Sequence, residues 1–228
     1  MLKLFVGFDE RESAAIHTFV HSVMTRSSKP ISFTFLARNQ LSFTDPSQKE
    51  DYPQSNAFIF SRFLVPALCG FKGWALFCDG DMLCMDDISK LFELADETKA
   101  VQVVKHDYKT KYPVKYLGAK NEDYPKKNQS SVILFNCGHP ANRTLTKEFV
   151  EASNGAYLHR FGWLDDDLIG SLPFEWNHLV LEQEPNTKAS IVHWTCYGPY
   201  HNGYETVEYG EEFKSEYNAM TRCDQMLE

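Results

Sequence analysis

The sequence has few of the features that would assign it to a specialised class of protein. None of the apolar runs in its 228 residues approaches the roughly 18 residues of a membrane span. The first apolar segment is too short, and reaches an acidic residue too soon, for a signal peptide, so we expect a strand there instead. The chain also lacks internal repeats and low-complexity linkers. At about 150 residues per domain, its length indicates one large domain with at most a short extension.

Basic residues are too few for a nucleic-acid-binding protein. Lys and Arg number 23 against 31 Asp and Glu, which gives a net charge of −8 with neutral histidines. Proteins that bind nucleic acid usually carry a basic stripe, and this balance argues against one. A phosphate-bearing substrate would therefore need local cations or a metal ion.

Cysteine pairs with the spacing of a zinc site are absent as well. The six cysteines are scattered, and no two of them form a C-x-x-C motif. A chain of this size does not need disulfides to stabilise its core. We expect reduced, mostly buried thiols and a cytoplasmic location. The cysteines are Cys69, Cys78, Cys84, Cys137, Cys196 and Cys223.

Apolar segments of strand length alternate with segments of helical periodicity. Strands are predicted at 2–8, 31–35, 74–78, 100–104, 131–135 and 189–194. Helices are predicted from Asp9, which has capping-box spacing to Glu12, as far as Met24, and at 56–69, 88–94 and 145–152. This alternation is typical of an α/β protein with a mostly parallel sheet. Ligands of such sheets bind beyond the carboxyl ends of the strands, so charged residues directly after apolar runs are the candidates for chemistry.

Two segments show little periodicity. Residues 106–129 are polar and lysine-rich, and a loop of this length is usually functional or mobile, so we expect it to order over a bound ligand. The stretch from Pro199 onward is acidic and aromatic. We therefore expect one domain over 1–200 and a C-terminal extension over 201–228 that packs on or near it.

The strongest local signal is Asp79-Gly80-Asp81, which directly follows a buried strand. In extended chain, residues i and i+2 point to the same side about 6.6 Å apart, so two carboxylates can share a divalent ion. Oxygen ligands of this kind suit Mn²⁺ or Mg²⁺. The alternative is an acidic turn that ends the strand. Asp86 and Asp87 come just before a helix and are better explained as its cap.

His193 and Arg62 are candidates that could complete this site. His193 ends a late strand and could supply an imidazole ligand, although a lone histidine is more often a hydrogen-bonded core residue. Arg62 stands among apolar neighbours, where arginine is seldom buried without a partner. An ion pair with Asp81, a bound phosphate or a partly exposed helix face would each explain it.

Two further groups of polar residues adjoin apolar segments. Ser130 and Ser131 precede a strand and could contact sugar hydroxyls, or merely end the preceding loop. The run Asp165-Asp166-Asp167 precedes an apolar pair and is by default an N-cap cluster. Three adjacent anions could also hold a ligand, because they repel unless a cation or hydroxyl donors stabilise them.

Taken in order along the chain, these residues resemble those of the GT-A nucleotide-sugar glycosyltransferases. The similarity is greatest to glycosyltransferase family 8, the glycogenin and bacterial galactosyltransferase type, and it spans roughly 1–200. It rests on the ordered set of Asp9, Arg62, Asp79-Gly80-Asp81, Ser131 to Asn136, Asp165 to Asp167, Trp176-Asn177 and His193. The resemblance implies a GT-A (Rossmann-like) fold in a single domain. It also implies metal-dependent transfer of a sugar from a nucleotide-diphosphate donor, a UDP-sugar, to an unidentified saccharide, lipid or protein acceptor with retention.

The resemblance also assigns residues to roles. Asp79, Asp81 and His193 would bind Mn²⁺ or Mg²⁺, and Asp165, Asp166 and Arg62 would serve catalysis. The residues implied in donor binding are Phe8, Asp9, Arg11, Arg62, Asp79, Gly80, Asp81, Ser130, Ser131 and Gly198.

The chain departs from the family pattern at two places. The usual Asp-Gln-Asp is Asp165-Asp166-Asp167 here, and the motif that begins at His193 has no lysine in its diphosphate-contacting place. Lys126 or Lys127 could substitute for that lysine.

Other classes place acidic pairs after strands. A haloacid-dehalogenase-type phosphohydrolase would carry its Asp-x-Asp after the first strand and follow it with Thr or Val, whereas Met82-Leu83 follows here. A nucleotidyltransferase would need a Gly-rich loop ending in Thr-Arg near the first strand, and the segment after Phe8 is not one. A non-catalytic nucleotide-sugar-binding module is the third alternative.

Overall fold

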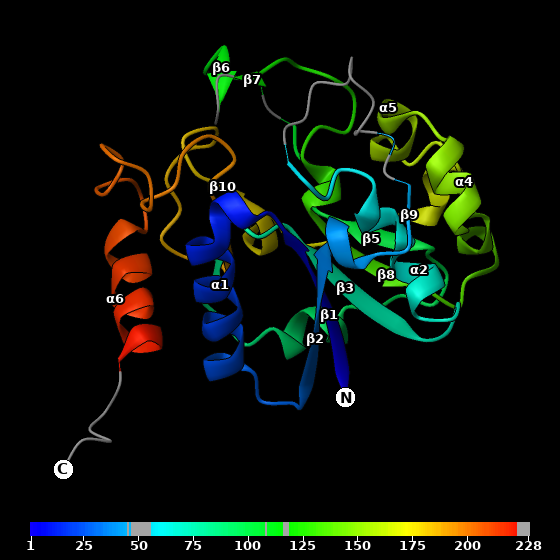
Figure 1. Cartoon of the computed structure of the whole chain (residues 1–228), viewed down its shortest axis with the longest axis horizontal. Coiled ribbons are helices and arrows are strands. Elements are labelled where there is room, and N and C mark those ends of the chain that lie inside the picture. The colour runs from blue at the N-terminus through cyan, green and yellow to red at the C-terminus, as the bar shows by residue number, and fades with distance from the viewer. Residues whose placement is uncertain (45, 47–55, 108, 116–118, 223–228) are drawn as a thin grey trace.

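The computed structural model of the protein describes residues 1–44, 46, 56–107, 109–115 and 119–222. Its centre is a six-stranded sheet in the order β2-β1-β3-β8-β5-β9 (Figure 1). The strands are β1 (Leu2–Phe8), β2 (Ile31–Ala37), β3 (Trp74–Cys78), β5 (Val101–Val103), β8 (Val132–Asn136) and β9 (Ile169–Ser171). β8 runs antiparallel to both its neighbours, and all other pairs are parallel. The predicted α/β fold with a mixed, mostly parallel sheet is confirmed.

Helices cover both faces of this sheet because successive strand residues point to opposite sides. Leu4 and Val6 of β1 join a core cluster with α1 (Ser13–Arg26) and α3 (Ser89–Glu93). Phe5, between them, belongs to the opposite cluster. That second cluster includes residues of α2 (Val65–Leu68), α4 (Lys147–Ala152) and α5 (Gly155–His159), the helices to the right in Figure 1.

A smaller sheet and a hairpin lie beside the central sheet. The smaller sheet has the order β10-β11-β4, and its strands are β10 (His178–Leu179), β11 (Ile191–His193) and β4 (Met82–Cys84). Only three residues separate β3 from β4, so the chain passes directly from the large sheet into the small one. β11 pairs antiparallel with β4. The hairpin consists of β6 (Val114–Lys115) and β7 (Ala119–Lys120).

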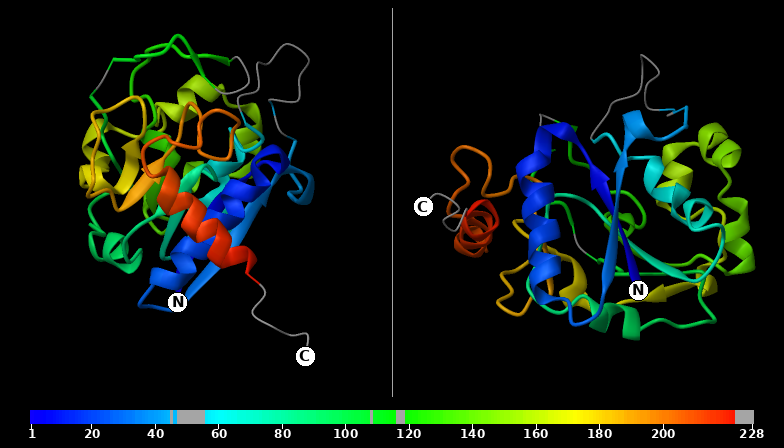
Figure 2. Two further views of the ribbon diagram at one scale, coloured as in Figure 1. Left: turned by 90° about the vertical axis from the view of Figure 1, so that its left-hand side faces the viewer. Right: turned by 60° about the horizontal axis from the view of Figure 1, so that its bottom comes forward.

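The acidic and aromatic tail contains a helix, α6 (Gly210–Thr221), that sequence periodicity did not reveal. Figure 2 shows α6 lying along α1. Phe213 of α6 is buried against Trp194, with ring centroids 5.6 Å apart. The buried Glu216 carboxylate contacts Arg26 Nη1 at 2.7 Å and His21 Nδ1 at 2.5 Å. The polar helix α6 is thus attached through one aromatic ring and one buried acid. Because so few of its apolar side chains are buried, its sequence shows only a weak helical period.

Several sequence expectations about secondary structure need correction. The helix predicted over 56–69 is a 3₁₀ turn, Ser61–Leu64, followed by the single turn of α2. The chain cannot continue a regular helix backward through Pro66, which has no amide hydrogen to donate. The short elements β4, β9, β10 and α5 were missed, because two to five residues are too few to show a period.

The segment 106–129 contains more structure than its sequence suggested. Besides the hairpin, it includes Lys127, which is buried and donates to Asn121 Oδ1 at 2.6 Å and Thr110 Oγ1 at 2.7 Å. The Asn121 side chain in turn donates to the buried Glu182 at 2.6 Å. The expectation that the segment orders over a ligand stays a prediction, and its residues 108 and 116–118 lie outside the described part.

The described cysteines form no disulfide with one another. Cys69, Cys78, Cys84, Cys137 and Cys196 are free thiols, and all but Cys69 are buried, as predicted. Cys223 lies outside the described residues.

Within the part of the chain that the structure describes, no helix has both the length and the apolar character needed to cross a membrane.

We predict that Glu216→Gln lowers the free energy of unfolding by about 1 to 3 kcal/mol, because Arg26 and His21 lose a buried charged acceptor. Urea denaturation measures the change. Glu93→Gln is the control, because it removes only the exposed pair with Lys29 and should cost less than about 1 kcal/mol. Equal losses in the two variants would show that α6 is not held through Glu216.

Candidate functional site

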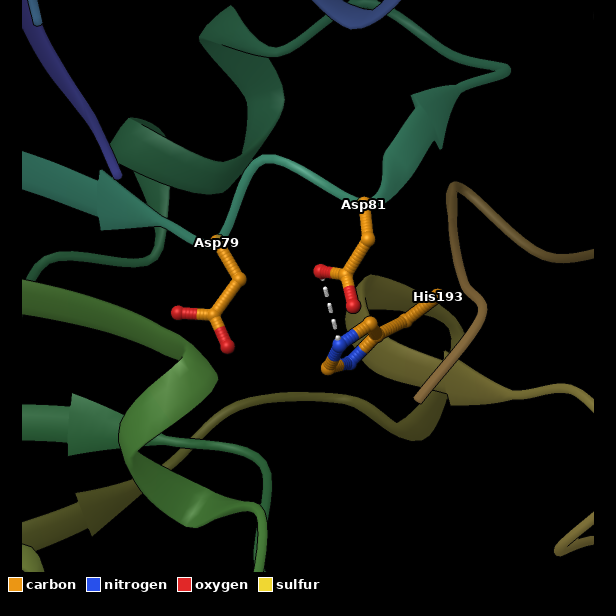
Figure 3. A group of neighbouring side chains, drawn as sticks. All are labelled: Asp79, Asp81 and His193. Carbon is orange, nitrogen blue, oxygen red and sulfur yellow. Dashed lines mark ion pairs between the residues drawn. The ribbon is translucent and has the colours of Figure 1, made fainter. Parts of the chain in front are cut away.

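Three side chains from different parts of the chain converge at the junction of the two sheets. Asp79 directly follows β3, Asp81 directly precedes β4, and His193 ends β11. One possible ligand atom from each of the three lies within 4.8 Å of the others, and no other such group of His, Cys, Asp or Glu exists among the described residues. Figure 3 shows the carboxylates and the imidazole directed toward a common space. The structure therefore brings together the three residues predicted to bind a metal.

Strand pairing explains why a residue so distant in sequence reaches the acidic pair. His193 pairs with Met82 across β11 and β4, and Asp81 is the neighbour of Met82. The Trp194 amide donates to the Asp81 carbonyl at 3.1 Å and continues this pairing by one residue. His193 Nε2 consequently lies 3.2 Å from Asp81 Oδ1. The imidazole is 2% exposed, so its position is determined by the small sheet and not by solvent.

Arg62 supports the first of the two aspartates. Its side chain is 3% exposed, and its guanidinium carbon lies over the rings of both Phe58 and Phe77, about 5 Å from each ring centroid. Arg62 Nη1 is 2.8 Å from Asp79 Oδ1 and donates to the Ser130 carbonyl at 2.8 Å. Of the explanations that the sequence allowed, burial with an acidic partner is correct, but the partner is Asp79 and not Asp81. Direct contact of Arg62 with a donor stays a prediction.

Gly80 is required by packing. A Cβ atom on this residue would lie 2.4 Å from Ile16 Cγ1 and 2.8 Å from the Gly7 carbonyl oxygen. The link between the two aspartates is therefore pressed against α1 and β1. Glycine is needed here because of this close approach.

The site residues fit a divalent cation such as Mn²⁺ or Mg²⁺. Two carboxylates and one imidazole form a donor set in which oxygen predominates. Asp81 Oδ1 is buried and accepts no hydrogen bond within the described part of the chain. A buried carboxylate oxygen without such a bond is costly unless a cation compensates its charge.

Glu12 is a fourth acidic residue near the site, and the sequence interpretation missed its role. Its side chain is buried, and burial together with the charges of Asp81, Asp9 and Asp79 raises the pKa of Glu12 to about 9. Its spacing from Asp9 suggested a capping box, but the cap is Asp9 alone, which accepts from the Arg11 amide at 3.1 Å. The carboxyl group is thus protonated at neutral pH when no cation is bound.

A cavity of about 480 Å³ opens beyond the carboxyl ends of β1 and β2. Asp9 lies in its wall, and its carboxylate accepts from Arg11 Nε at 2.8 Å and from the Ala57 amide at 3.1 Å. Burial raises the pKa of Asp9, but the hydrogen bonds and charge of Arg11 outweigh it, and the net shift is downward. The cavity is lined by Phe8, Asp9, Glu10, Arg11, Arg38, Asn39 and Ala57.

Phe8, Asp9 and Arg11 were predicted to bind the donor, and the structure places them together in this cavity. Arg38 and Asn39 were missed. Both follow β2, which pairs parallel with β1 along its whole length, so the ends of these strands meet. Their position as two polar residues shortly after the second predicted strand would have marked them as candidates.

The predicted serines contribute their backbone to the site. The Ser131 carbonyl accepts from the Asp79 amide at 2.9 Å, and the Ser130 carbonyl accepts from Arg62. Their hydroxyls are engaged elsewhere: Ser131 Oγ donates to Asn128 at 2.6 Å, and Ser130 Oγ bonds to His159 Nδ1 at 2.7 Å. Donor contact through these hydroxyls stays a prediction.

The acidic run from Asp165 to Asp167 differs from the buried cluster in its exposure. All three side chains are exposed, and Asp165 makes no side-chain capping hydrogen bond. Asp166 Oδ1 is 2.6 Å from Lys126 Nζ. Of the two lysines considered as substitutes for the missing one, Lys127 is buried in the loop and Lys126 is paired with Asp166.

Gly198, another residue predicted to bind the donor, begins a short turn. Its amide donates to His201 Nδ1 at 3.1 Å, which orients the His201 ring. Burial lowers the pKa of His201, while the Gly198 carbonyl and the negative charge of Asp81 act in the opposite direction. His201 therefore lies within electrostatic reach of the acidic cluster, and the sequence interpretation did not single it out.

Solved structures with the same fold are glycosyltransferases. LgtC, a galactosyltransferase solved with donor and acceptor sugar analogs, is 12% identical with a TM-score of 0.65, and the match covers 98% of each chain. GlyE of Streptococcus pneumoniae is 13% identical with a TM-score of 0.63, over 96% of this chain and 63% of GlyE. The bifunctional glycosyltransferase WbbM is 17% identical with a TM-score of 0.59, and the chain spans about half of it, 49%. The protein thus has the GT-A-type fold.

A much closer relative is known from its sequence. Protein CDI of Arabidopsis thaliana is 41% identical over 220 residues, which cover 94% of this chain and 85% of that protein. The chain belongs to the family of Protein CDI. No protein-family model matches the sequence.

We predict that Glu12→Gln stabilises the protein at neutral pH in EDTA. Folding raises the pKa of Glu12 from 4.5 to about 9, so the folded state must take up a proton and the free energy of unfolding falls as pH rises through this window. The glutamine amide cannot ionise, so in the variant the free energy of unfolding should no longer fall with pH in this window. Denaturation at several pH values between 5 and 8 measures it. Glu10→Gln, at an exposed position, is the control, and a wild-type slope in Glu12→Gln would contradict the assignment.

Proposed function

We propose that the protein is a divalent-cation-dependent glycosyltransferase of the family 8 type that uses a UDP-sugar. The observation that carries this proposal is the group of Asp79, Asp81 and His193 at the carboxyl edge of a GT-A-type sheet, in which Asp79 and His193 are buried and Asp81 is partly buried. A diphosphate carries negative charge, and a cation held by these acidic groups would offset their repulsion of it. The glycosyltransferases that share the fold support the same conclusion.

The cation, when bound, would supply charge stabilisation to the diphosphate as it leaves the sugar. The protein groups prepare the site for it. Arg62 orients the Asp79 carboxylate through an ion pair, and the pairing of β4 with β11 sets His193 beside Asp81. Gly80 allows the two aspartates to lie against α1. Because these groups are fixed by buried contacts, little reorganisation is needed when charge develops.

The cavity beside β1 and β2 is the proposed nucleoside site. Its volume of about 480 Å³ falls within the range of small-molecule sites. Phe8 offers an aromatic ring, and Asp9 is held ionised by Arg11 so that it can accept hydrogen bonds. Asp9 immediately follows β1 and Asp79 immediately follows its neighbour β3, so a nucleoside and a diphosphate could occupy adjacent places at one sheet edge.

Asp165 and Asp166 are proposed to contact the sugar. Their exposed carboxylates can accept hydrogen bonds from sugar hydroxyls, and Lys126 already compensates one of them. We propose retention through attack on the same face as the leaving group, with the departing phosphate taking the acceptor proton. Asp166 then orients hydroxyls and is not a nucleophile. The acceptor class stays open among saccharides, lipids and proteins.

Two other functions remain to be tested. A haloacid-dehalogenase-type phosphohydrolase would use one aspartate as a nucleophile, but Asp79 is held by Arg62 and follows the third strand of the chain. A non-catalytic nucleotide-sugar-binding module would use the same cavity and cation. Product analysis separates them: release of UDP with sugar transfer, release of inorganic phosphate, or binding alone.

We predict that UDP-sugars with Mn²⁺ give UDP release, and that Asp81→Asn lowers turnover at least about 100-fold, because removing a metal ligand should cost more than removing its outer partners. A coupled UDP assay measures it. Asp86→Asn is the matched control, because Asp86 lies outside the cluster and pairs with Lys90. Near-normal turnover of Asp81→Asn, or equal activity in EDTA, would contradict the metal role.

Stereochemistry gives a second prediction. The first-formed product from an α-linked donor should be α-linked, and NMR of that product reads its configuration directly. Asp166→Asn should keep measurable activity, because an amide oxygen still accepts a hydrogen bond from a sugar hydroxyl. A β-linked product would exclude retention and with it the family 8 assignment.

A further inference from the structure

Asn177 lies behind the cation site and contacts it through His193. It is the last residue of a 3₁₀ turn, Phe174–Asn177, and its side chain is fully buried. β10 begins at the next residue and pairs with β11, so that Leu179 stands opposite His193. The strand pairing thus carries Asn177 to the side of the imidazole that faces away from Asp81.

The Asn177 amide bonds to three neighbours, and one of them determines its orientation. Its nitrogen Nδ2 donates to the Asn128 carbonyl at 3.2 Å, and a carbonyl oxygen can only accept. The opposite orientation would place two acceptor oxygens against each other. His106 Nε2 lies 3.0 Å from the same nitrogen, but Gln183 Nε2 faces the other nitrogen of that ring at 3.2 Å, and a neutral imidazole accepts at one nitrogen only. The Asn128 carbonyl is therefore the contact that sets the orientation of the amide.

The orientation of this amide has a consequence for His193. Asn177 Oδ1 lies 2.9 Å from His193 Nδ1, and an amide oxygen cannot donate. Nδ1 must therefore carry a hydrogen, and whenever the ring is neutral its lone pair is on Nε2. That lone pair faces Asp81 Oδ1 at 3.2 Å. Two acceptors at this distance repel each other unless a cation shares them.

We propose that Asn177 is a positioning residue that holds His193 in the Nδ1–H tautomer, so that Nε2 is available to bind a divalent cation. A second hydrogen bond to the far nitrogen is how histidine ligands are oriented in metal sites. The inference rests on the cation site proposed above. It assigns to a buried amide a function in cation affinity in addition to its contribution to stability.

Two substitutions separate positioning from packing. Asn177→Leu keeps most of the volume and removes the acceptor. Asn177→Asp keeps an acceptor for His193 Nδ1–H while it loses the donor to Asn128. Asn142→Leu is the matched control: Asn142 is also fully buried and donates to the Ala100 and Asn136 carbonyls at 2.7 and 2.8 Å, as part of the core and not of the site.

The experiment measures the His193 tautomer and Mn²⁺ affinity in the full chain. Long-range ¹H–¹⁵N NMR of the metal-free protein, with the His193 signal assigned by its loss in His193→Gln, should show the Nδ1–H form in the wild type and in Asn177→Asp. Asn177→Leu should show a mixture of tautomers. Calorimetry with Mn²⁺ alone should give an affinity about 10- to 100-fold weaker for Asn177→Leu than for the wild type. Asn142→Leu should lose stability while its Mn²⁺ affinity stays at the wild-type value.

Each outcome supports or contradicts the inference. An Nε2–H tautomer in the wild type, or wild-type Mn²⁺ affinity in Asn177→Leu, would overturn it while leaving the proposed function intact. Absence of Mn²⁺ binding in the wild type would overturn both. If Asn177→Leu fails to fold, the tautomers of the wild type and of Asn177→Asp still decide the question.

Discussion

Burial of several acidic groups at one point is the constraint on which the rest of the structure depends. The charges of Asp9, Asp79 and Asp81 act on Glu12, and together with burial they raise its pKa to about 9, so that Glu12 is protonated when no cation is present. Negative charges so concentrated are unfavourable away from water unless cations compensate them. Arg11 compensates Asp9 and Arg62 compensates Asp79. Asp81 has no arginine among its described contacts, and a divalent cation shared with His193 would supply the missing charge.

The two sheets fix the positions of the residues that form the cation site. Asp79 directly follows a strand of the large sheet and Asp81 directly precedes a strand of the small one. The short link between the two aspartates therefore connects the two sheets. Gly80 makes that link possible because no Cβ fits between Ile16 and the Gly7 carbonyl. His193 is brought in by strand pairing, and Asn177 by the strand next to it. Ligands held by strands are positioned more accurately than ligands on loops.

Much of the site could be predicted because its residues directly follow strands that are easy to recognise. Asp79 directly follows one buried apolar run and His193 ends another, which marked both as candidates, although the runs lie in two different sheets that meet at the site. Arg62 was recognised as buried from its apolar neighbours. Its partner was assigned incorrectly, because sequence alone does not tell which of two nearby aspartates a guanidinium will face.

Other features depend on contacts between distant segments, which leave no local pattern. Glu12 has a raised pKa only because the fold brings Asp81 and Asp79 close to it. The sequence offered Lys127 as a substitute for the missing lysine, yet its ammonium group donates hydrogen bonds to Asn121 and Thr110 within the loop. α6 is attached mainly through the buried Phe213 and Glu216, too few groups to produce a helical period. Strands of two or three residues likewise form only because a neighbour is already in place.

Anomalous diffraction from crystals soaked in Mn²⁺ and UDP tests the central claim most directly. The account predicts a manganese peak within bonding distance of Asp79, Asp81 and His193 Nε2, with the uridine in the cavity beside Phe8 and Asp9. A peak at the exposed acidic run from Asp165 to Asp167 instead, or bound UDP without manganese at the buried cluster, would contradict it.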